Sequence, residues 1–171
     1  MCTMPSMSTQ NSLQPASRSL HLVDVENLLG TPRPLQSDVM PLAAEYAELA
    51  GIGPRDHVVI ASSHICASTV WYEWPGAARR LLASGPDGAD NALLGVLACE
   101  QAAQRFGRVV IASGDGIFAE AAARLQMGGT DVTVVCGVGS LARRLQMAVL
   151  DVRQLEMPQC HDTSTALRRA A

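Results

Sequence analysis

Three acidic segments lie where short apolar stretches of the chain end. Asp24 follows the apolar residues 20–23, Asp90 opens a long apolar helical pattern, and Asp115 follows residues 109–112. Because the carboxyl ends of parallel strands meet at one edge of an open α/β sheet, we expect these carboxylates to converge. Converging carboxylates repel one another unless a cation joins them, and hard cations such as Mg²⁺ prefer oxygen ligands. The pattern predicts a metal-dependent phosphate-handling site.

The elements that must position these acids alternate along the chain. An apolar run is followed by a helical pattern several times over, which is typical of a parallel sheet covered on both faces. The predicted fold class is α/β, a three-layer α/β/α domain whose central, mostly parallel sheet has five or six strands. Strands are predicted at residues 20–25, 57–61, 80–83, 108–112, 132–136 and 149–152, and helices at 37–50, 65–72, 90–106, 117–127 and 141–147.

Length and composition favour one folded domain with two tails. The chain has 171 residues, of which 48% are hydrophobic and 17% charged. We expect a disordered leader at 1–18, the domain at 19–156 and a flexible tail at 157–171. No apolar run approaches the roughly 18–20 residues that span a bilayer. The first 18 residues lack the basic start and apolar segment of a secretory signal, so a cytoplasmic protein without a membrane partner is expected.

The other residue types that bind metals or nucleic acids give weaker patterns. Five cysteines and four histidines are scattered without CxxC or helical metal-ligand spacing, which argues against a zinc site or a disulfide framework. The net charge of −3 does not by itself indicate a nucleic-acid-binding protein. All 13 basic residues are arginine, so mechanisms that depend on lysine are excluded.

The acidic segments, taken in order, resemble a known family. Their motifs are Asp24-x-x-Asn27, Gly88-x-Asp90 and the Ser-Gly-Asp that ends at Asp115. Over about residues 20–155 the chain is similar to the NYN domain family, a branch of the PIN-like metal-dependent ribonucleases. The resemblance implies an α/β/α fold, hydrolysis of phosphodiester bonds in single-stranded or structured RNA, and Mg²⁺ or Mn²⁺ as cofactor.

The resemblance also implies roles for individual residues. Asp24, Asp90 and Asp115 would be metal ligands and, with Asn27, the catalytic set. A metal ion held there would lower the pKa of a water molecule and neutralise charge at the attacked phosphate. The Asn27 amide would hold a phosphate oxygen or a metal-bound water.

Phosphate contacts are expected from the turn around the third acid. The backbone N–H groups at Ser113, Gly114 and Gly116 would lie at a helix start, where they can bind a phosphate. The two glycines would also allow a close approach because they carry no Cβ. Arg143, with Arg144 beside it, would contact the RNA backbone, although a solvated helix face is the simpler explanation for Arg144.

One departure from the family pattern affects the metal site. Ile117 stands where the family usually has a second aspartate, so one potential ligand is missing. Asp87, in the loop before Asp90, or Glu26, two residues beyond Asp24, would supply the missing negative charge. Glu26 would share a face with Asp24 if the first strand continued.

Structural explanations exist for several of these residues. Asp90 and Asp115 could each cap a helix, which is a common role for aspartate. The aromatic cluster of Trp71, Tyr72 and Trp74 could stack bases, pack internally or form a homodimer contact.

Two alternative functions remain open at this point. A haloacid dehalogenase-type phosphatase is suggested by a resemblance of Asp24-Val25-Glu26 to its nucleophile motif and of Gly114-Asp115-Gly116 to its metal motif. Glu26 replaces the acid/base aspartate of that family, however, and the chain has no lysine for its third motif. The Ile117 substitution favours a second alternative, a catalytically weakened PIN-like module that binds RNA or a protein.

Overall fold

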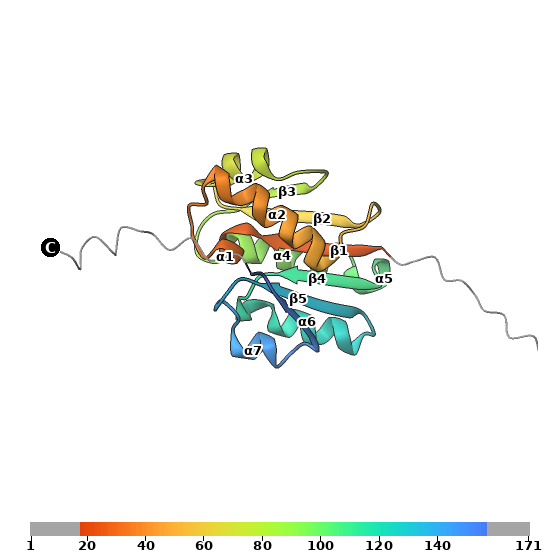
Figure 1. Ribbon diagram of the computed structural model, residues 1–171. Coiled ribbons are helices and arrows are strands. Elements are labelled where there is room, and N and C mark those ends of the chain that lie inside the picture. Colours follow the sequence, from red (N-terminus) through yellow and green to blue (C-terminus); the bar gives the residue numbers. More distant parts are fainter. Residues whose placement is uncertain (1–17, 157–171) are drawn as a thin grey trace, which may run out of the picture.

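The computed structural model describes residues 18–156, which form one sheet between two layers of helices (Figure 1). The predicted leader and tail, except for Arg18, lie outside the described residues. The strands are β1 (Ser19–Asp24), β2 (His57–Ser62), β3 (Arg79–Leu82), β4 (Arg108–Ala112), β5 (Asp131–Cys136) and β6 (Asp151–Gln154). The helices are α1 (Val25–Leu29), α2 (Gln36–Ala50), α3 (Ala67–Glu73), α4 (Gly88–Cys99), α5 (Ala102–Arg105), α6 (Ala119–Met127) and α7 (Arg143–Gln146), with a 3₁₀ turn, η1 (Gly116–Phe118), before α6.

The sheet is parallel throughout, with the strand order β3-β2-β1-β4-β5-β6. The chain builds outward from β1 to β3, then returns to the other side of β1 and builds outward again to β6. The strand order therefore reverses between β1 and β4, and open α/β sheets bind their ligands in the crevice at such a switch point. The predicted α/β/α fold class is confirmed, with six strands.

Both faces of the sheet are covered, which explains why its strands are apolar on both sides. Residues of α1, α2 and α3 pack on the face that carries Val23 and Ile60. Residues of α4, α5, α6 and α7 pack on the opposite face, against Leu22 and Ile111. In Figure 1, α2 and α3 lie toward the top of the view and α6 and α7 toward the bottom.

The first strand is shorter than predicted, and this changes the position of Glu26. β1 ends at Asp24, and α1 begins at Val25. The Asp24 side chain accepts a hydrogen bond from the Asn27 backbone N–H at 3.1 Å and so caps α1. The prediction that Glu26 shares a strand face with Asp24 is therefore wrong, because local capping outcompetes extension of the strand.

The long helix predicted at 90–106 is also interrupted. α4 begins at Gly88 and ends at Cys99, and Gln101 has a left-handed backbone with φ of 51° before α5 begins. Glu100, at the break, pairs with Arg79 and Arg105. The break also lets the chain turn back toward β4. The remaining boundaries agree with the predictions to within two residues. α2 begins after Leu35 without a side-chain cap, so Ser37 does not cap it.

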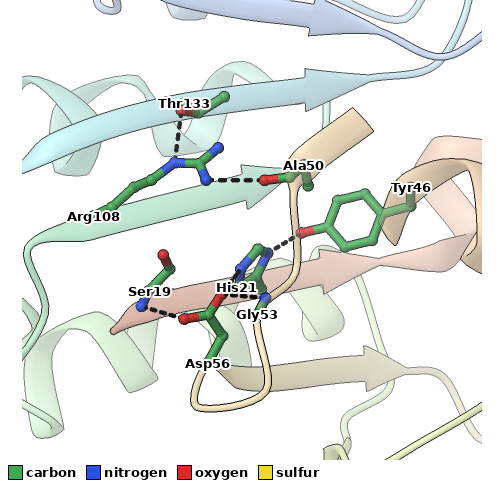
Figure 2. A network of polar contacts seen from close by, with 8 residues as sticks. All are labelled: Ser19, His21, Tyr46, Ala50, Gly53, Asp56, Arg108 and Thr133. Atoms are coloured by element: carbon green, nitrogen blue, oxygen red, sulfur yellow. Dashed lines mark hydrogen bonds and ion pairs between the residues drawn. The ribbon is translucent and has the colours of Figure 1, made fainter. Parts of the chain in front are cut away.

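A buried polar network ties the amino ends of the strands to α2 (Figure 2). Asp56 accepts hydrogen bonds from the backbone N–H groups of Ser19 at 2.7 Å and Gly53 at 2.8 Å. His21 Nε2 lies 3.4 Å from Asp56 Oδ2, and its Nδ1 lies 2.8 Å from the Tyr46 hydroxyl. Because a carboxylate only accepts, Nε2 carries the proton and Nδ1 accepts from Tyr46.

Arg108 and Arg153 extend the contact to the last turn of α2. Arg108 Nη1 donates to the Ala50 carbonyl at 2.9 Å, and Arg153 Nη1 donates to the Leu49 carbonyl at 2.7 Å. These guanidinium groups satisfy carbonyls that have no partner within the helix and lie at the negative end of its dipole. The network therefore holds α2 against the end of the sheet that lies opposite to the predicted carboxylate site.

This network predicts a loss of stability in acid. Burial lowers the pKa of His21 below its ordinary value of 6.5, and neighbouring Asp56 only partly offsets this. Burial by itself raises the pKa of Asp56, but the Ser19 and Gly53 amides and His21 outweigh it and hold the pKa below 3.8. In both cases the unfolded chain takes up the proton first, so stability is complete above the unfolded pKa and is lost as the pH falls.

Comparison of the wild type with His21→Gln isolates the contribution of the histidine to the pH dependence of stability. The raised pKa of Asp24 changes stability with pH in the opposite sense, but it does so in both proteins and cancels in the difference. The groups that face His21 are Asp56, Tyr46 and Arg108. Relative to His21→Gln, the wild type should lose unfolding free energy as the pH falls below about 6.5. Urea denaturation at several pH values measures this difference. A difference that stays constant between about pH 7 and pH 5 would contradict the prediction.

Candidate active site

The switch point of the sheet places the first and third acidic segments next to each other. β1 pairs with β4 so that Val23 lies opposite Ala112. Asp24 is the next residue on one strand, and Ser113 is the next on the other. The two turns are then joined by Asn27, whose Oδ1 accepts a hydrogen bond from the Gly114 backbone N–H at 2.8 Å. Asn27 therefore positions the turn that carries Asp115.

Asp24 is almost fully buried, with 5% of its surface exposed. Burial raises its pKa to about 7, against the opposing effect of the Asn27 N–H, and the nearby Asp90 raises it further. The two carboxyls lie close enough for a protonated Asp24 to donate a hydrogen bond to Asp90. Burial and the neighbouring carboxylate therefore both favour the neutral form of Asp24 when no cation is bound.

Asp90 lies in the first turn of α4 and is 9% exposed. Its Oδ1 is buried and has no hydrogen-bond partner. Burial raises the pKa of Asp90, and the charges of Asp115 and Asp87 raise it further, while the hydrogen bond from Asp24 lowers it. An unpartnered carboxylate oxygen at this depth is costly unless something positive binds to it.

Asp115 completes the acidic edge and is the most accessible of the three, with its side chain 40% exposed. Its Oδ1 accepts a hydrogen bond from the Ile117 backbone N–H at 2.9 Å, so it caps η1. The same oxygen lies 3.9 Å from Nη2 of Arg144. The structure thus brings Asp24, Asp90 and Asp115 to one edge of the sheet, with Asp115 engaged by its own turn and by an arginine.

Asp87 and Glu26, the two candidates for the missing charge, differ in their surroundings. Glu26 Oε1 accepts hydrogen bonds from the Ser63 N–H at 2.8 Å and from the Cys66 thiol at 2.6 Å, and it is held there. Asp87 precedes α4 in a left-handed conformation with φ of 52°, and its side chain caps nothing. Because Asp87 acts on Asp90 electrostatically and has an uncommitted carboxylate, it is the better candidate.

The turn around Asp115 is shaped by protein contacts rather than by open space. Ser113 is fully buried, and its hydroxyl accepts a hydrogen bond from the Asp115 N–H at 3.2 Å. A Cβ on Gly114 would lie 2.3 Å from the Ser140 carbonyl oxygen, and a Cβ on Gly116 would lie 2.0 Å from Nε of Arg144. Glycine is therefore required at positions 114 and 116 because the segment 140–144 packs against them. The Gly114 N–H already donates to Asn27 Oδ1, so it is not free to bind a phosphate as predicted.

Ile117, which replaces the second family aspartate, faces a groove of about 600 Å³ between α4 and α6. Leu94 and Leu125 line the same groove, and Ile117 packs against the second hydrophobic cluster. The Ile117 side chain therefore packs among apolar neighbours. Among residues 18–156, no three His, Cys, Asp or Glu side chains are arranged to hold a metal ion in their present conformations.

The aromatic and basic residues predicted to contact RNA lie in different places. Trp74 is buried and Trp71 packs against the first hydrophobic cluster, which supports internal packing, whereas Tyr72 is 84% exposed. A homodimer contact at these residues stays a prediction. Arg143 is exposed in α7. Arg144, for which the sequence favoured a solvated helix face, is the residue that approaches Asp115.

Comparisons with known proteins bear on the fold. No family model and no curated protein matches the chain. Among solved structures, a protein of unknown function, VPA0982 from Vibrio parahaemolyticus RIMD 2210633, is 16% identical with a TM-score of 0.53, over 84% of this chain and 96% of that chain. The MAR1 ribonuclease from Caenorhabditis elegans is 10% identical with a TM-score of 0.44, over 92% of this chain and 90% of that chain. The first likeness shows the fold alone, and the second is too slight to bear on function. Within residues 18–156, no helix has the length and apolar character needed to cross a membrane.

Proposed function

We propose that this protein is a metal-dependent ribonuclease whose active site is the Asp24, Asp90 and Asp115 edge of the sheet. The observation that carries the proposal is the Asp90 carboxylate, which is buried beside Asp24 with its Oδ1 unpartnered. A buried pair of carboxylates is unfavourable by itself, and a hard divalent cation is the partner that suits its oxygen donors. The position at the switch point of a parallel sheet supports a ligand site.

Each residue has a distinct role in this proposal. Asp24 and Asp90 would hold Mg²⁺ or Mn²⁺, and the more exposed Asp115 would turn from its capping contact to join them. The ion would activate a water molecule and neutralise charge on the phosphate. Asn27 holds the Asp115 turn through its Oδ1, which leaves its amide N–H groups to donate to a phosphate oxygen.

Cleavage of RNA tests the proposal directly. Purified protein is incubated with labelled single-stranded and hairpin RNA in Mn²⁺ or Mg²⁺, with EDTA and the Asp115→Asn variant as controls. Cleavage that is lost in both controls is the expected result. Cleavage that persists in EDTA and in Asp115→Asn would indicate a contaminating nuclease and remove the support for this site.

A second candidate function is a binding module of the same fold without turnover. Ile117 in place of an acid and the Asp115 contacts with Ile117 N–H and Arg144 favour it. It predicts that RNA binds but is not cleaved in either metal. The phosphatase alternative has less support, because Glu26 is held by Ser63 and Cys66 and the chain has no lysine.

Binding of Mn²⁺ should raise the melting temperature. A ligand that binds only the folded state stabilises it by about 2.7 kcal/mol at 100 times its Kd. For a domain of this size that is roughly 5–10 °C. Differential scanning fluorimetry with and without millimolar Mn²⁺ measures the shift, and Asp90→Asn should abolish it. An unchanged wild-type melting temperature would argue against metal binding by these carboxylates.

A further inference from the structure

The Arg144 side chain lies against Gly116, which belongs to the turn that carries Asp115. A Cβ on Gly116 would stand 2.0 Å from Nε, 2.7 Å from Cγ and 2.8 Å from Cδ of this arginine. The segment that carries Arg144 is held against the same turn, because the Ala142 N–H donates to the Gly114 carbonyl at 2.8 Å. Any side chain at position 116 would therefore displace the arginine.

The guanidinium group of Arg144 is only loosely engaged. Its Nη2 lies 3.9 Å from Asp115 Oδ1, and the two side chains are 68% and 40% exposed. An exposed ion pair at this separation contributes little to stability. Arginine offers five N–H donors in a planar fork, so most of them stay open to solvent in this arrangement. The small contribution of this ion pair to stability does not explain why an arginine lies against a glycine next to three carboxylates.

Five other arginines of the described residues have partners away from the three carboxylates. Arg79 and Arg105 bind Glu100, and Arg124 binds Glu120. Arg108 and Arg153 bind carbonyls at the end of α2. Arg144 is the arginine that forms an ion pair with a member of the acidic cluster. Arg144 is therefore placed to counter the negative charge of the three carboxylates when an anion approaches.

We propose that Arg144 binds a phosphate of the RNA at this site, and that residue 116 is glycine in order to admit it. The inference rests on the proposed function. Three carboxylates repel an incoming phosphodiester, whereas a guanidinium binds two phosphate oxygens at once. When a phosphate binds the guanidinium group of Arg144, Asp115 loses its ion-pair partner, and its carboxylate becomes available to a cation. Arg144, rather than its neighbour Arg143, is then the phosphate contact of α7.

Binding of a short fluorescein-labelled oligouridylate tests the role of Arg144. Fluorescence anisotropy in EDTA, over a series of NaCl concentrations, gives the affinity without metal or turnover. Arg144→Ala should weaken binding at least about tenfold and reduce the salt slope by about 0.7, as expected for one lost phosphate contact to a single strand. Arg143→Ala should change the affinity less than twofold. Arg144→Lys should keep the salt slope and recover part of the affinity, since it retains the charge without the fork.

The role of Gly116 is tested by a double-mutant cycle. Gly116→Ala should weaken binding as much as Arg144→Ala, and the double variant should be no weaker than Arg144→Ala alone. Gly95→Ala is the matched control, because a Cβ there meets no atom within 4 Å. Additive losses in the double variant would show that Gly116 acts independently of the arginine and would overturn this part of the proposal.

Cleavage in Mn²⁺ separates this inference from the proposed function. If the wild type cleaves RNA and Arg144→Ala binds and cleaves like it, the inference fails and the ribonuclease stands. If the wild type binds RNA through Arg144 without cleaving, the ribonuclease fails and the inference stands. If the wild type does not bind the oligonucleotide, or Arg143→Ala loses as much affinity as Arg144→Ala, the inference is overturned.

Discussion

Asp24→Asn is expected to lower RNA cleavage by more than about 100-fold while leaving the fold intact. Substitution of groups that only support metal ligands already costs about 10–100-fold, so loss of a ligand should cost more. The fold should survive because asparagine is also a good helix cap and can still accept from the Asn27 N–H. It also removes a buried carboxyl whose pKa burial and Asp90 raise to about 7, so the melting temperature should be unchanged or higher.

Cleavage rates and melting temperatures of the wild type and the variant give the result together. Asp131→Asn is the matched control, because this exposed aspartate begins β5 at the opposite edge of the sheet. It should cleave RNA at the wild-type rate. Wild-type cleavage by Asp24→Asn would exclude Asp24 from the mechanism. A large fall in the melting temperature would instead show that the carboxylate is needed for the fold.

Phe118→Ala is expected to reduce the free energy of unfolding by about 3–5 kcal/mol, the usual cost of truncating a buried aromatic ring. Phe118 is fully buried and belongs to the hydrophobic cluster between the sheet and α4 and α6. It also ends η1, the turn that Asp115 caps, and its backbone N–H donates to the Asp115 carbonyl. This core residue therefore anchors the loop that presents the third acid.

Urea denaturation measures the change, with the slope of the transition as a check that both proteins unfold in the same way. Phe118→Leu is the matched control, and it should lose much less stability because it refills most of the cavity. Cleavage by the folded fraction of Phe118→Ala should fall only moderately, since no acidic group is removed. A loss of stability below about 1 kcal/mol would mean that the site collapses around the smaller side chain.

The general arrangement of the fold and the convergence of the acids could be predicted from the sequence alone. Strands apolar on both faces, such as residues 109–112, alternate with helical patterns, and burial on both sides is what a parallel sheet requires. The carboxyl ends of parallel strands share one edge, so acids placed after the strands must meet there. Asp24, Asp90 and Asp115 lie close together for this reason, even though they are far apart in the chain.

The predicted ends of two elements were wrong because single polar contacts end them earlier than their hydrophobic patterns do. The first strand was expected to reach Val25, but the Asp24 side chain accepts a hydrogen bond from the Asn27 N–H, and a helix begins at Val25 instead. The helix from Gly88 was expected to continue past Cys99, but Glu100 pairs with two arginines at a break in the backbone. In each case one short-range or ionic contact outweighs a hydrophobic pattern, and the pattern does not contain that contact.

Contacts between distant segments were decided by the tertiary structure. Asn27 and Gly114 are 87 residues apart in sequence, and Glu26 and Cys66 are 40 apart, yet each pair is hydrogen-bonded. Arg144 likewise reaches Gly116 only because the segment 140–144 packs on the Asp115 turn. The sequence by itself determined which residues reach the carboxyl edge of the sheet, because strand direction sets that edge. Which side chains pair there depends on the path of the connecting loops, and only the folded chain specifies that path.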